Sequence, residues 1–276
     1  MRVQSTVENY FAQHSLFGHE LTAEWLLSTK KLFAKRGSSG LKRDTGKNTR
    51  VGLFGGTFNP IHWGHLRSAE EIRERFDLGR VIFIPVHVAP HKKADVISSE
   101  HRCAMVKKAI RGNSFFQVSD IELQRPGKSY SIDTIRHFHG LSQGQEELFF
   151  IMGMDAFREI PVWKDYPAFF SACNFIVMTR PGAHDVQPAE LIPRDIEKEF
   201  TRQEREQCFV HTSGCRIYTA PVTPLDISST NIRACTAAGK SIRYLVPRNV
   251  ERYIAGHQLY RITATPGRLP QRPPAG

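Results

Sequence analysis

The sequence predicts an α/β protein whose open parallel sheet carries helices on both faces. Three observations support this class. From Arg50 onward, short apolar runs alternate with stretches of helical spacing, the pattern of a parallel sheet with crossover helices. A Gly-Gly turn follows the first apolar run and precedes the first helical stretch. A chain of 276 residues with 40% hydrophobic residues can bury the core of one such domain and carry extensions.

The predicted elements follow one another in chain order. The first strand, 51–54, is a continuous apolar run, and the helix at 66–76 places Leu66, Ala69 and Ile72 on one face. Similar apolar runs predict further strands at 81–84, 115–118, 148–152, 175–178 and 217–219. Helical spacing, capping residues and polar composition predict further helices at 100–111, 132–138, 197–207, 230–238 and 247–255.

The two ends of the chain differ from this unit, which spans residues 50–260. Residues 1–49 are predicted to form a basic extension and linker, partly disordered, and residues 261–276 a disordered tail rich in Pro and Arg. The net charge of +11 comes mostly from these ends: residues 1–50 hold nine Lys or Arg against four acids, and the tail holds three Arg and no acid. The unit between them is mildly basic, which suits anionic nucleotides. It has no basic stripe with interleaved aromatic residues, so no nucleic-acid partner is expected.

Composition also indicates whether the chain could span a membrane, build a metal site or form disulfides. No apolar run approaches the ~18 residues of a membrane span, and no signal-peptide pattern is present, so no membrane partner is expected. The five cysteines are scattered without CxxC spacing, which indicates reduced thiols rather than a disulfide frame or zinc site. The expected location is cytoplasmic and no protein-built metal site is expected. A homo-oligomer is left open.

The turn after the first strand carries the strongest functional signal. Residues 55–65 read GGTFNPIHWGH, in the order strand, turn, helix. Helix N-termini bind phosphate through unpaired N–H groups and the positive end of the dipole. Gly55 and Gly56 let a ligand approach the backbone, and His62 and His65 can face one anion across the glycine between them. Each feature alone is equally typical of a tight turn or of a histidine with a structural role.

A second stretch, ISSTNIR at 227–233, points to the same chemistry. The hydroxyls of Ser228, Ser229 and Thr230 lie at a predicted helix start, and Arg233 follows one turn later. Hydroxyl and N–H groups there can hold a phosphate, which the guanidinium can neutralise. Alone, the stretch is equally typical of an ordinary N-cap.

The two motifs together resemble those of the HxGH nucleotidylyltransferases, and most closely those of the bacterial nicotinate-nucleotide adenylyltransferases. Residues 50–260 carry the resemblance, with Asn59 where Asp is commoner. It implies a single catalytic domain of Rossmann-like fold that transfers the adenylyl group of ATP to nicotinate mononucleotide. The products are nicotinate adenine dinucleotide and pyrophosphate, in NAD biosynthesis, formed by in-line attack without a covalent enzyme intermediate. It also implies His62, His65 and Arg233 as catalytic residues and Mg²⁺ bound with ATP as the cofactor.

Further site residues follow from matches to the same family. The resemblance implies that ATP is bound by Gly55, Gly56, Thr57, Phe58, His62, His65, Arg180, Ser228, Ser229, Thr230 and Arg233. It implies that the mononucleotide is bound by Lys92, Tyr130, Ser131, Asp155 and Trp163. Two of the matching segments depart from the family pattern, at Ala89 for Pro and Ser131 for Thr. Exposed loop lysines, a helix cap and a packed Trp remain alternative interpretations of these residues.

Two classes of rival function remain. A pantetheine-phosphate adenylyltransferase or a cytidylyltransferase shares the HxGH signature, although such enzymes usually lack the GGTF(N/D)P lead-in together with ISSTxIR. The other class is a non-catalytic nucleotide sensor, or an RNA-binding protein that uses its basic ends. Intact His62, His65 and Arg233 favour catalysis.

Overall fold

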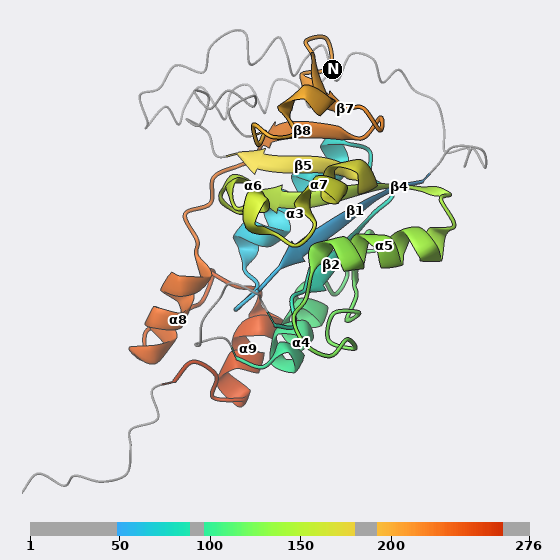
Figure 1. Ribbon diagram of the computed structural model, residues 1–276. Helices are drawn as coiled ribbons and strands as arrows, with labels where there is room; N and C mark the ends of the chain where they lie inside the picture. The colour runs from blue at the N-terminus through green and yellow to red at the C-terminus, as the bar shows by residue number, and fades with distance from the viewer. Residues whose placement is uncertain (1–48, 89–96, 180–191, 262–276) are drawn as a thin grey trace, which may run out of the picture. The chain divides into compact units, whose positions relative to one another are not determined.

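The computed structural model describes residues 49–88, 97–179 and 192–261 (Figure 1). They form an eight-stranded sheet of order β3-β2-β1-β4-β5-β8-β7-β6. Its strands are β1 Thr49–Gly56, β2 Arg80–Pro85, β3 Phe116–Val118, β4 Glu146–Gly153, β5 Asn174–Thr179, β6 Phe200–Gln203, β7 Cys208–His211 and β8 Arg216–Pro221. The α-helices are α3 Trp63–Arg75, α4 Ser99–Ala109, α5 Ser131–Ser142, α6 Met154–Arg158, α7 Tyr166–Ala172, α8 Ser229–Ala237 and α9 Arg248–Gly256.

Six of the strands pair in parallel, with β1 near the centre. Leu53 of β1 is in register with Ile82 of β2 on one side and with Phe150 of β4 on the other. The chain leaves β1 toward β2 and β3, and returns later to β4 on the opposite side of β1. This reversal of strand order is the point at which open α/β sheets bind ligands, outside the carboxyl ends of the strands. The predicted Rossmann-like α/β class is confirmed.

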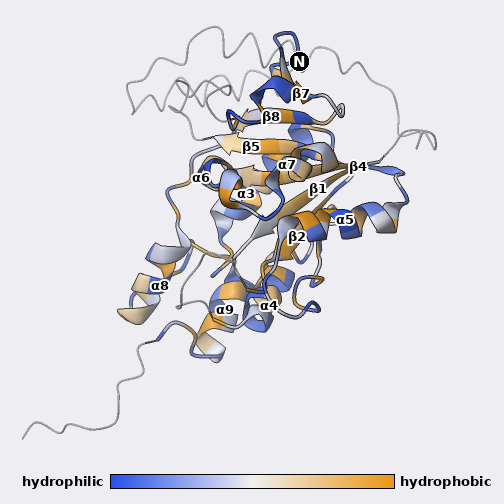
Figure 2. Ribbon diagram, in the orientation of Figure 1, coloured by the Kyte–Doolittle hydropathy of each residue, from blue (hydrophilic) through white to orange (hydrophobic). Residues whose placement is uncertain are grey.

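A hydrophobic core lies on each face of the sheet. Figure 2 shows that much of the ribbon of the central strands is coloured hydrophobic. Because neighbouring strand residues point to opposite faces, Phe54 and Leu53 of β1 belong to different cores. The Phe54 core is covered by α3, α4, α8 and α9, which contribute residues such as Ile72. The Leu53 core is covered by α5, α6 and α7, which contribute residues such as Ile135. Helices therefore lie on both faces, as predicted.

One predicted helix is wrong. The segment 197–207 was predicted to be helical from its polar, charged composition, but it forms a 3-10 turn at Glu197–Glu199 followed by β6. Strand β6 pairs antiparallel with β7, a strand that the sequence did not predict, and β7 pairs antiparallel with β8. Charged residues suit the exposed edge of a sheet as well as a solvated helix. The buried Phe209 anchors this hairpin to the core.

The remaining predicted strands and helices are present within a few residues of their expected bounds. The short helices α6 and α7 were not predicted. The proposed extension up to residue 48 and the tail from residue 262 lie outside the described residues. Within the described part of the chain, no helix has both the length and the apolar composition needed to cross a membrane.

Candidate active site

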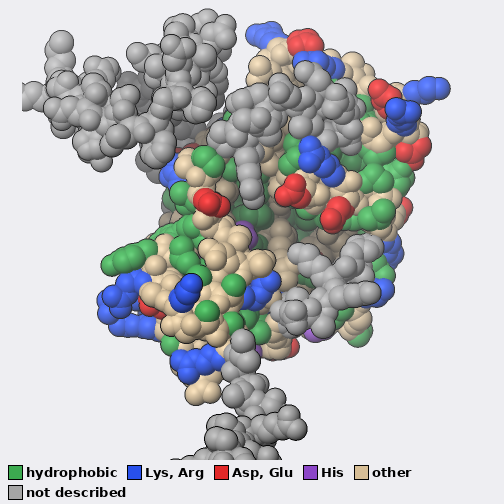
Figure 3. All heavy atoms as spheres, turned by 90° about the vertical axis from the view of Figure 1, so that its left-hand side faces the viewer, with side chains coloured by type: hydrophobic (Ala, Val, Ile, Leu, Met, Phe, Trp, Pro, Cys, Tyr) green, Lys and Arg blue, Asp and Glu red, His purple; other side chains and the backbone are tan. Residues whose placement is uncertain are grey.

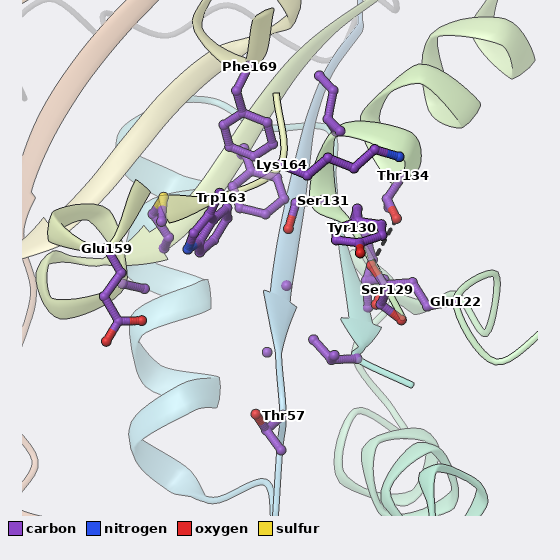
Figure 4. A pocket seen from close by; sticks show the side chains of 18 of the residues that line it. Thr57, Glu122, Ser129, Tyr130, Ser131, Thr134, Glu159, Trp163, Lys164 and Phe169 are labelled. Atoms are coloured by element: carbon purple, nitrogen blue, oxygen red, sulfur yellow. Dashed lines mark hydrogen bonds between the residues drawn. The ribbon is translucent and has the colours of Figure 1, made fainter. Parts of the chain in front are cut away.

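A cavity of about 520 Å³ opens at the carboxyl end of β1, between the turn that leads to α3 and the start of α5 (Figure 4). Its walls include Gly55, Gly56 and Thr57 on one side and Tyr130 and Ser131 on the other. The volume lies in the range of small-molecule sites. Figure 3 views this edge of the sheet, and Lys and Arg side chains gather in its lower half, at the level of α8 and α9. A basic surround favours an anionic ligand.

Packing leaves little room for a side chain at either position of the Gly-Gly turn, and least at Gly56. A Cβ on Gly56 would lie 2.9 Å from the ring of Phe58, and one on Gly55 would lie 3.2 Å from the ring of Phe150. The turn therefore presents bare backbone to the cavity, packed against Phe58 in the core and against Phe150, which also lines the cavity. Phe58 as a whole is 2% exposed, contacts Phe54 edge-on and is absent from the cavity lining, so it supports the turn from within the core.

His62 and His65 form a stacked pair at the start of α3. Their ring centroids are 3.8 Å apart, and the His62 backbone N–H donates to Nδ1 of His65 over 3.3 Å. Because Nδ1 of His65 accepts this bond, a neutral His65 carries its proton on Nε2. That Nε2–H is the donor available to a ligand.

Burial keeps both imidazoles neutral in the free protein. Desolvation lowers the pKa of His62 to about 4, and desolvation together with the neighbouring His62 lowers the pKa of His65 well below its usual 6.5. The sequence suggested that Gly64 leaves room for an anion between the rings. A Cβ there would instead lie 3.0 Å from Nδ1 of His62, so that space holds the His62 ring.

The second motif docks directly on the first. The Ser229 hydroxyl donates to the Pro60 carbonyl over 2.8 Å, across 169 positions of sequence. Nη1 of Arg233 donates to the Asn59 carbonyl over 2.9 Å. Asn59 is also fixed through its Oδ1, which accepts from the hydroxyl of Tyr260 over 2.8 Å. The start of α8 and the start of α3 are thus held side by side.

The remaining hydroxyls of the second motif have local roles. Ser228 caps α8, because its side chain accepts from the Asn231 N–H over 3.1 Å, so the N-cap interpretation holds for this residue. Nη2 of Arg233 donates to the Thr230 hydroxyl over 3.3 Å. These bonds orient the Arg233 guanidinium toward the turn at 55–65.

The cavity brings together three of the five residues predicted to bind the mononucleotide: Tyr130, Ser131 and Trp163 (Figure 4). Trp163 packs edge-on against Phe169, with ring centroids 5.6 Å apart, and keeps a half-buried ring at the cavity wall. The Nζ of Lys164 lies 4.6 Å above the Tyr130 ring. An aromatic wall facing a helix start is suited to a planar ring that bears an anionic group.

The structure does not bring all predicted residues to this cavity. Asp155 is exposed in the first turn of α6 and is absent from the cavity lining, although its neighbour Ala156 contributes to it. Lys92 and Arg180 lie outside the described residues. Among residues 49–88, 97–179 and 192–261, no group of three or more His, Cys, Asp or Glu could hold a metal ion.

Sequence reasoning missed a buried carboxyl in the cavity wall. Glu122 is 5% exposed, and its Oε1 accepts the Thr134 hydroxyl over 2.8 Å. Its Oε2 has no hydrogen-bond partner among the described residues. Burial raises the pKa of this carboxyl, which favours its neutral form. A signal existed in the sequence, because Glu122 follows β3 and so lies at the ligand-binding edge.

The fold and site together define a class. A Rossmann-like sheet whose first turn carries two histidines, with a second helix start and an arginine docked on that turn, is the arrangement of a nucleotidyltransferase. The family model described as cytidylyltransferase-like matches residues 53–235. The chain belongs to this cytidylyltransferase-like family and, within it, to the nicotinate-nucleotide adenylyltransferases, as the following relatives show.

Proteins of Geotalea uraniireducens (strain Rf4) and Geobacter sulfurreducens carry the name "Probable nicotinate-nucleotide adenylyltransferase". Each is 47% identical to this chain over 212 residues, which make up 76% of this chain and 98% of the relative. Among solved structures, Plasmodium falciparum nicotinic acid mononucleotide adenylyltransferase complexed with NaAD aligns with a TM-score of 0.60 at 17% identity. That alignment covers 77% of this chain and 97% of the other, and it supports the fold.

Proposed function

We propose that this protein transfers the adenylyl group of ATP to nicotinate mononucleotide, forming nicotinate adenine dinucleotide and pyrophosphate in NAD biosynthesis. One observation carries the proposal: the turn at 55–65 and the start of α8 are joined through Ser229 and Arg233, beside a cavity walled by Trp163. The 47% identity to relatives of that name supports the choice of acceptor.

The triphosphate site would be the two adjoining helix starts. Phosphate groups accept hydrogen bonds from backbone N–H groups at the starts of α3 and α8 and from Nε2–H of His65. Because both imidazoles are neutral before binding, they accommodate the anion first as donors, and the anion then favours their protonation. Arg233 lies close enough to the turn to neutralise charge on the leaving pyrophosphate.

The transfer step requires correct positioning of the two substrates and no nucleophile from the protein. A phosphate oxygen of the mononucleotide attacks the α-phosphorus, and the bond to pyrophosphate breaks on the opposite side. Holding the two substrates in line, and stabilising charge as it develops, accounts for catalysis of this kind. Mg²⁺ would enter with ATP as part of the MgATP substrate and would help to neutralise charge on the leaving pyrophosphate.

The mononucleotide would occupy the cavity. Its pyridine ring stacks on Trp163, and its carboxylate accepts hydrogen bonds from Ser131 and from N–H groups at the start of α5. The raised pKa of Glu122 reduces repulsion between that carboxyl and an anionic ring substituent. Tyr130 closes the same wall of the cavity.

The test is an adenylyl-transfer assay with ATP and a panel of acceptors. We expect turnover with nicotinate mononucleotide, and little with phosphopantetheine or with CTP as the donor. Turnover only with phosphopantetheine would assign the chain to the rival enzyme class. No turnover with any acceptor, together with RNA retention on filters that is lost without residues 1–48, would support the RNA-binding alternative.

We also propose a cytoplasmic location and no nucleic-acid partner. The cytoplasmic location is supported by the five free cysteines, Cys103, Cys173, Cys208, Cys215 and Cys235. Absence of a nucleic-acid partner rests on the charge distribution, and a homo-oligomer remains open to measurement by light scattering.

A further inference from the structure

A buried arginine lies close to the cavity, and the proposed binding of ATP and nicotinate mononucleotide does not use it. Arg102 of α4 is 1% exposed, although it carries a charge. Its guanidinium donates to three backbone carbonyls: Nη1 to Thr57 over 2.8 Å, Nη2 to His87 over 3.1 Å and Nε to Ile97 over 3.1 Å. A charge removed from water is costly unless it is well hydrogen-bonded, so this arrangement needs a reason.

Two of those carbonyls belong to segments that leave neighbouring strands. Thr57 follows β1, within the turn proposed to hold ATP, and His87 follows β2. The two strands are adjacent and parallel, so both segments leave from the same edge of the sheet. Arg102 therefore links the ends of β1 and β2 from behind, through one planar group.

The second link continues to the proposed mononucleotide segment. The backbone N–H of His87 donates to the Ser129 hydroxyl over 3.2 Å, and the backbone N–H of Ser129 donates to the Val88 carbonyl over 3.0 Å. Ser129 directly precedes Tyr130, the N-cap of α5. The His87 ring is held as well, because its Nδ1 lies 2.8 Å from the hydroxyl of Ser99 at the start of α4. Arg102 is thus one hydrogen bond from the ATP turn and two from the segment that would bind the acceptor.

We propose that Arg102 is a positioning residue that sets the spacing between the ATP turn and the mononucleotide segment. The inference rests on the proposed function. Arg102 is absent from the cavity lining, so it acts through Thr57 and His87 rather than by touching substrate. In-line transfer is sensitive to spacing, since a displacement of about 1 Å can cost about 10²-fold in rate. Lysine cannot replace the planar fork that reaches several carbonyls at once.

The experiment compares Arg102→Lys and Arg102→Met with Asn174→Ala as a matched control. Asn174 is also buried, at 9% exposure, and bonds Glu147 over 3.1 Å and the Arg216 N–H over 2.9 Å. It begins β5, at the opposite edge of the sheet from the site. Each protein is measured well below its melting temperature for kcat per folded molecule. Calorimetry then gives Kd for nicotinate mononucleotide alone and for a non-hydrolysable ATP analogue alone.

We expect both Arg102 variants to lose about 10²-fold in kcat, the cost of a misplaced attack. Each separate Kd should change less than about fivefold, under the ~1 kcal/mol of a typical single contact. Asn174→Ala should lower the melting temperature while it keeps its kcat. Unchanged kcat in the Arg102 variants, or equal loss in kcat and in both affinities, would overturn the positioning role.

Failure of both Arg102 variants to fold would also overturn the proposal, because a positioning residue must be removable without loss of the fold. Activity of the wild-type protein distinguishes failure of the proposed function from failure of the inference about Arg102. An inactive wild type refutes the proposed function, whereas an active wild type with fully active Arg102 variants refutes this inference only.

Discussion

At the scale of single residues, the histidine pair shows how packing sets chemistry. Two imidazoles stacked 3.8 Å apart and shielded from water cannot both be charged at low cost. The pair is therefore neutral in the free protein, and under the proposed function it would present N–H donors to a phosphate. The same burial makes the pair part of the core, since His65 also packs edge-on against Phe58 with ring centroids 5.2 Å apart.

His65→Ala is expected to lower kcat by about 10²–10³, the range for one lost charge-stabilising donor. The sequence alone suggested that stability would hardly change. Packing against Phe58 and the bond from the His62 N–H indicate otherwise, and a loss of about 1–2 kcal/mol is expected. Steady-state kinetics and urea denaturation measure the two effects. Full activity in a destabilised variant would reduce His65 to a structural residue.

Stability of the ligand-free protein should depend on pH through His62. The folded-state pKa is about 4 against the usual 6.5, so the unfolded chain binds more protons between these values. The contribution is complete above pH 6.5 and is lost as pH falls toward 4, by about 3 kcal/mol in total. Urea denaturation at pH 7, 6 and 5 should show this slope, and His62→Asn should reduce it without abolishing it, because the lowered pKa of His65 acts in the same direction. Equal slopes in the two proteins would argue against a buried neutral His62.

At the scale of elements, the start of α5 and the loop that carries Trp163 face the cavity that is proposed to bind the acceptor. Ser131 and the first N–H groups of α5 form a donor-rich wall that suits an anion. Across the cavity, Trp163 offers a flat apolar face. Under the proposed function, the acceptor would be recognised through its ring carboxylate at the start of α5 and through its pyridine ring at Trp163.

Nicotinate mononucleotide should be preferred to its nicotinamide analogue. The amide loses charge-assisted hydrogen bonds worth about 1.5–3 kcal/mol each. We expect kcat/KM to favour the acid by at least roughly tenfold, the ratio that ~1.4 kcal/mol produces. Competition between the two acceptors in one assay gives this ratio directly. A ratio near one would exclude a carboxylate site at Ser131.

Trp163→Ala should raise KM for the mononucleotide far more than KM for ATP. The ring lies in the cavity wall, and no residue at the start of α3 or α8 contributes to that wall. Losing a stacking partner typically removes about 1–3 kcal/mol. Phe175, which is 0% exposed and absent from the cavity lining, provides a control: Phe175→Leu should lower the melting temperature more than it changes either KM. If the mononucleotide KM of Trp163→Ala stays at the wild-type value, Trp163 is only a packing residue.

At the scale of the whole molecule, the site lies within the unit that begins at β1. Thr49 already pairs with Glu146 of β4, and Tyr260 near the other end bonds Asn59 beside the histidines. Both ends of the described unit are therefore tied into the sheet or the site. The match to the Geotalea uraniireducens relative has a similar extent, because it covers 98% of that protein but only 76% of this chain.

A protein that starts near residue 49 should keep its kcat with ATP and nicotinate mononucleotide. The segment before it lies outside the resemblance and carries no matched motif. Kinetics and melting temperature of the truncated and full-length chains test this. Loss of turnover in folded, truncated protein would make residues 1–48 part of the active enzyme. A C-terminal cut before Tyr260 should be harmful instead, because it removes the bond to Asn59.

The sequence by itself determined the fold class and the two anchoring motifs. Of the five residues it proposed for the acceptor, three line the cavity, Asp155 does not, and the buried Glu122 was missed. Strand runs, the GGTFNPIHWGH turn and the ISSTNIR helix start depend on local spacing, which neighbouring residues largely decide. The hairpin of β6 and β7 was missed because polar composition suits an exposed strand as well as a helix. The strand conformation follows from pairing: β7 pairs with β8, and β8 in turn pairs with β5, which lies well before it in the chain.

Tertiary structure alone decided the electrostatic state of the site and its hidden supports. The neutral histidines, the buried carboxyl of Glu122 and the buried guanidinium of Arg102 all depend on which segments exclude water from them. Burial is a property of distant chain segments brought together, as when Arg102 reaches Thr57 across 45 positions. A charged residue in a sequence looks the same whether solvent or protein surrounds it, and only the folded arrangement fixes its pKa and its hydrogen-bond partners.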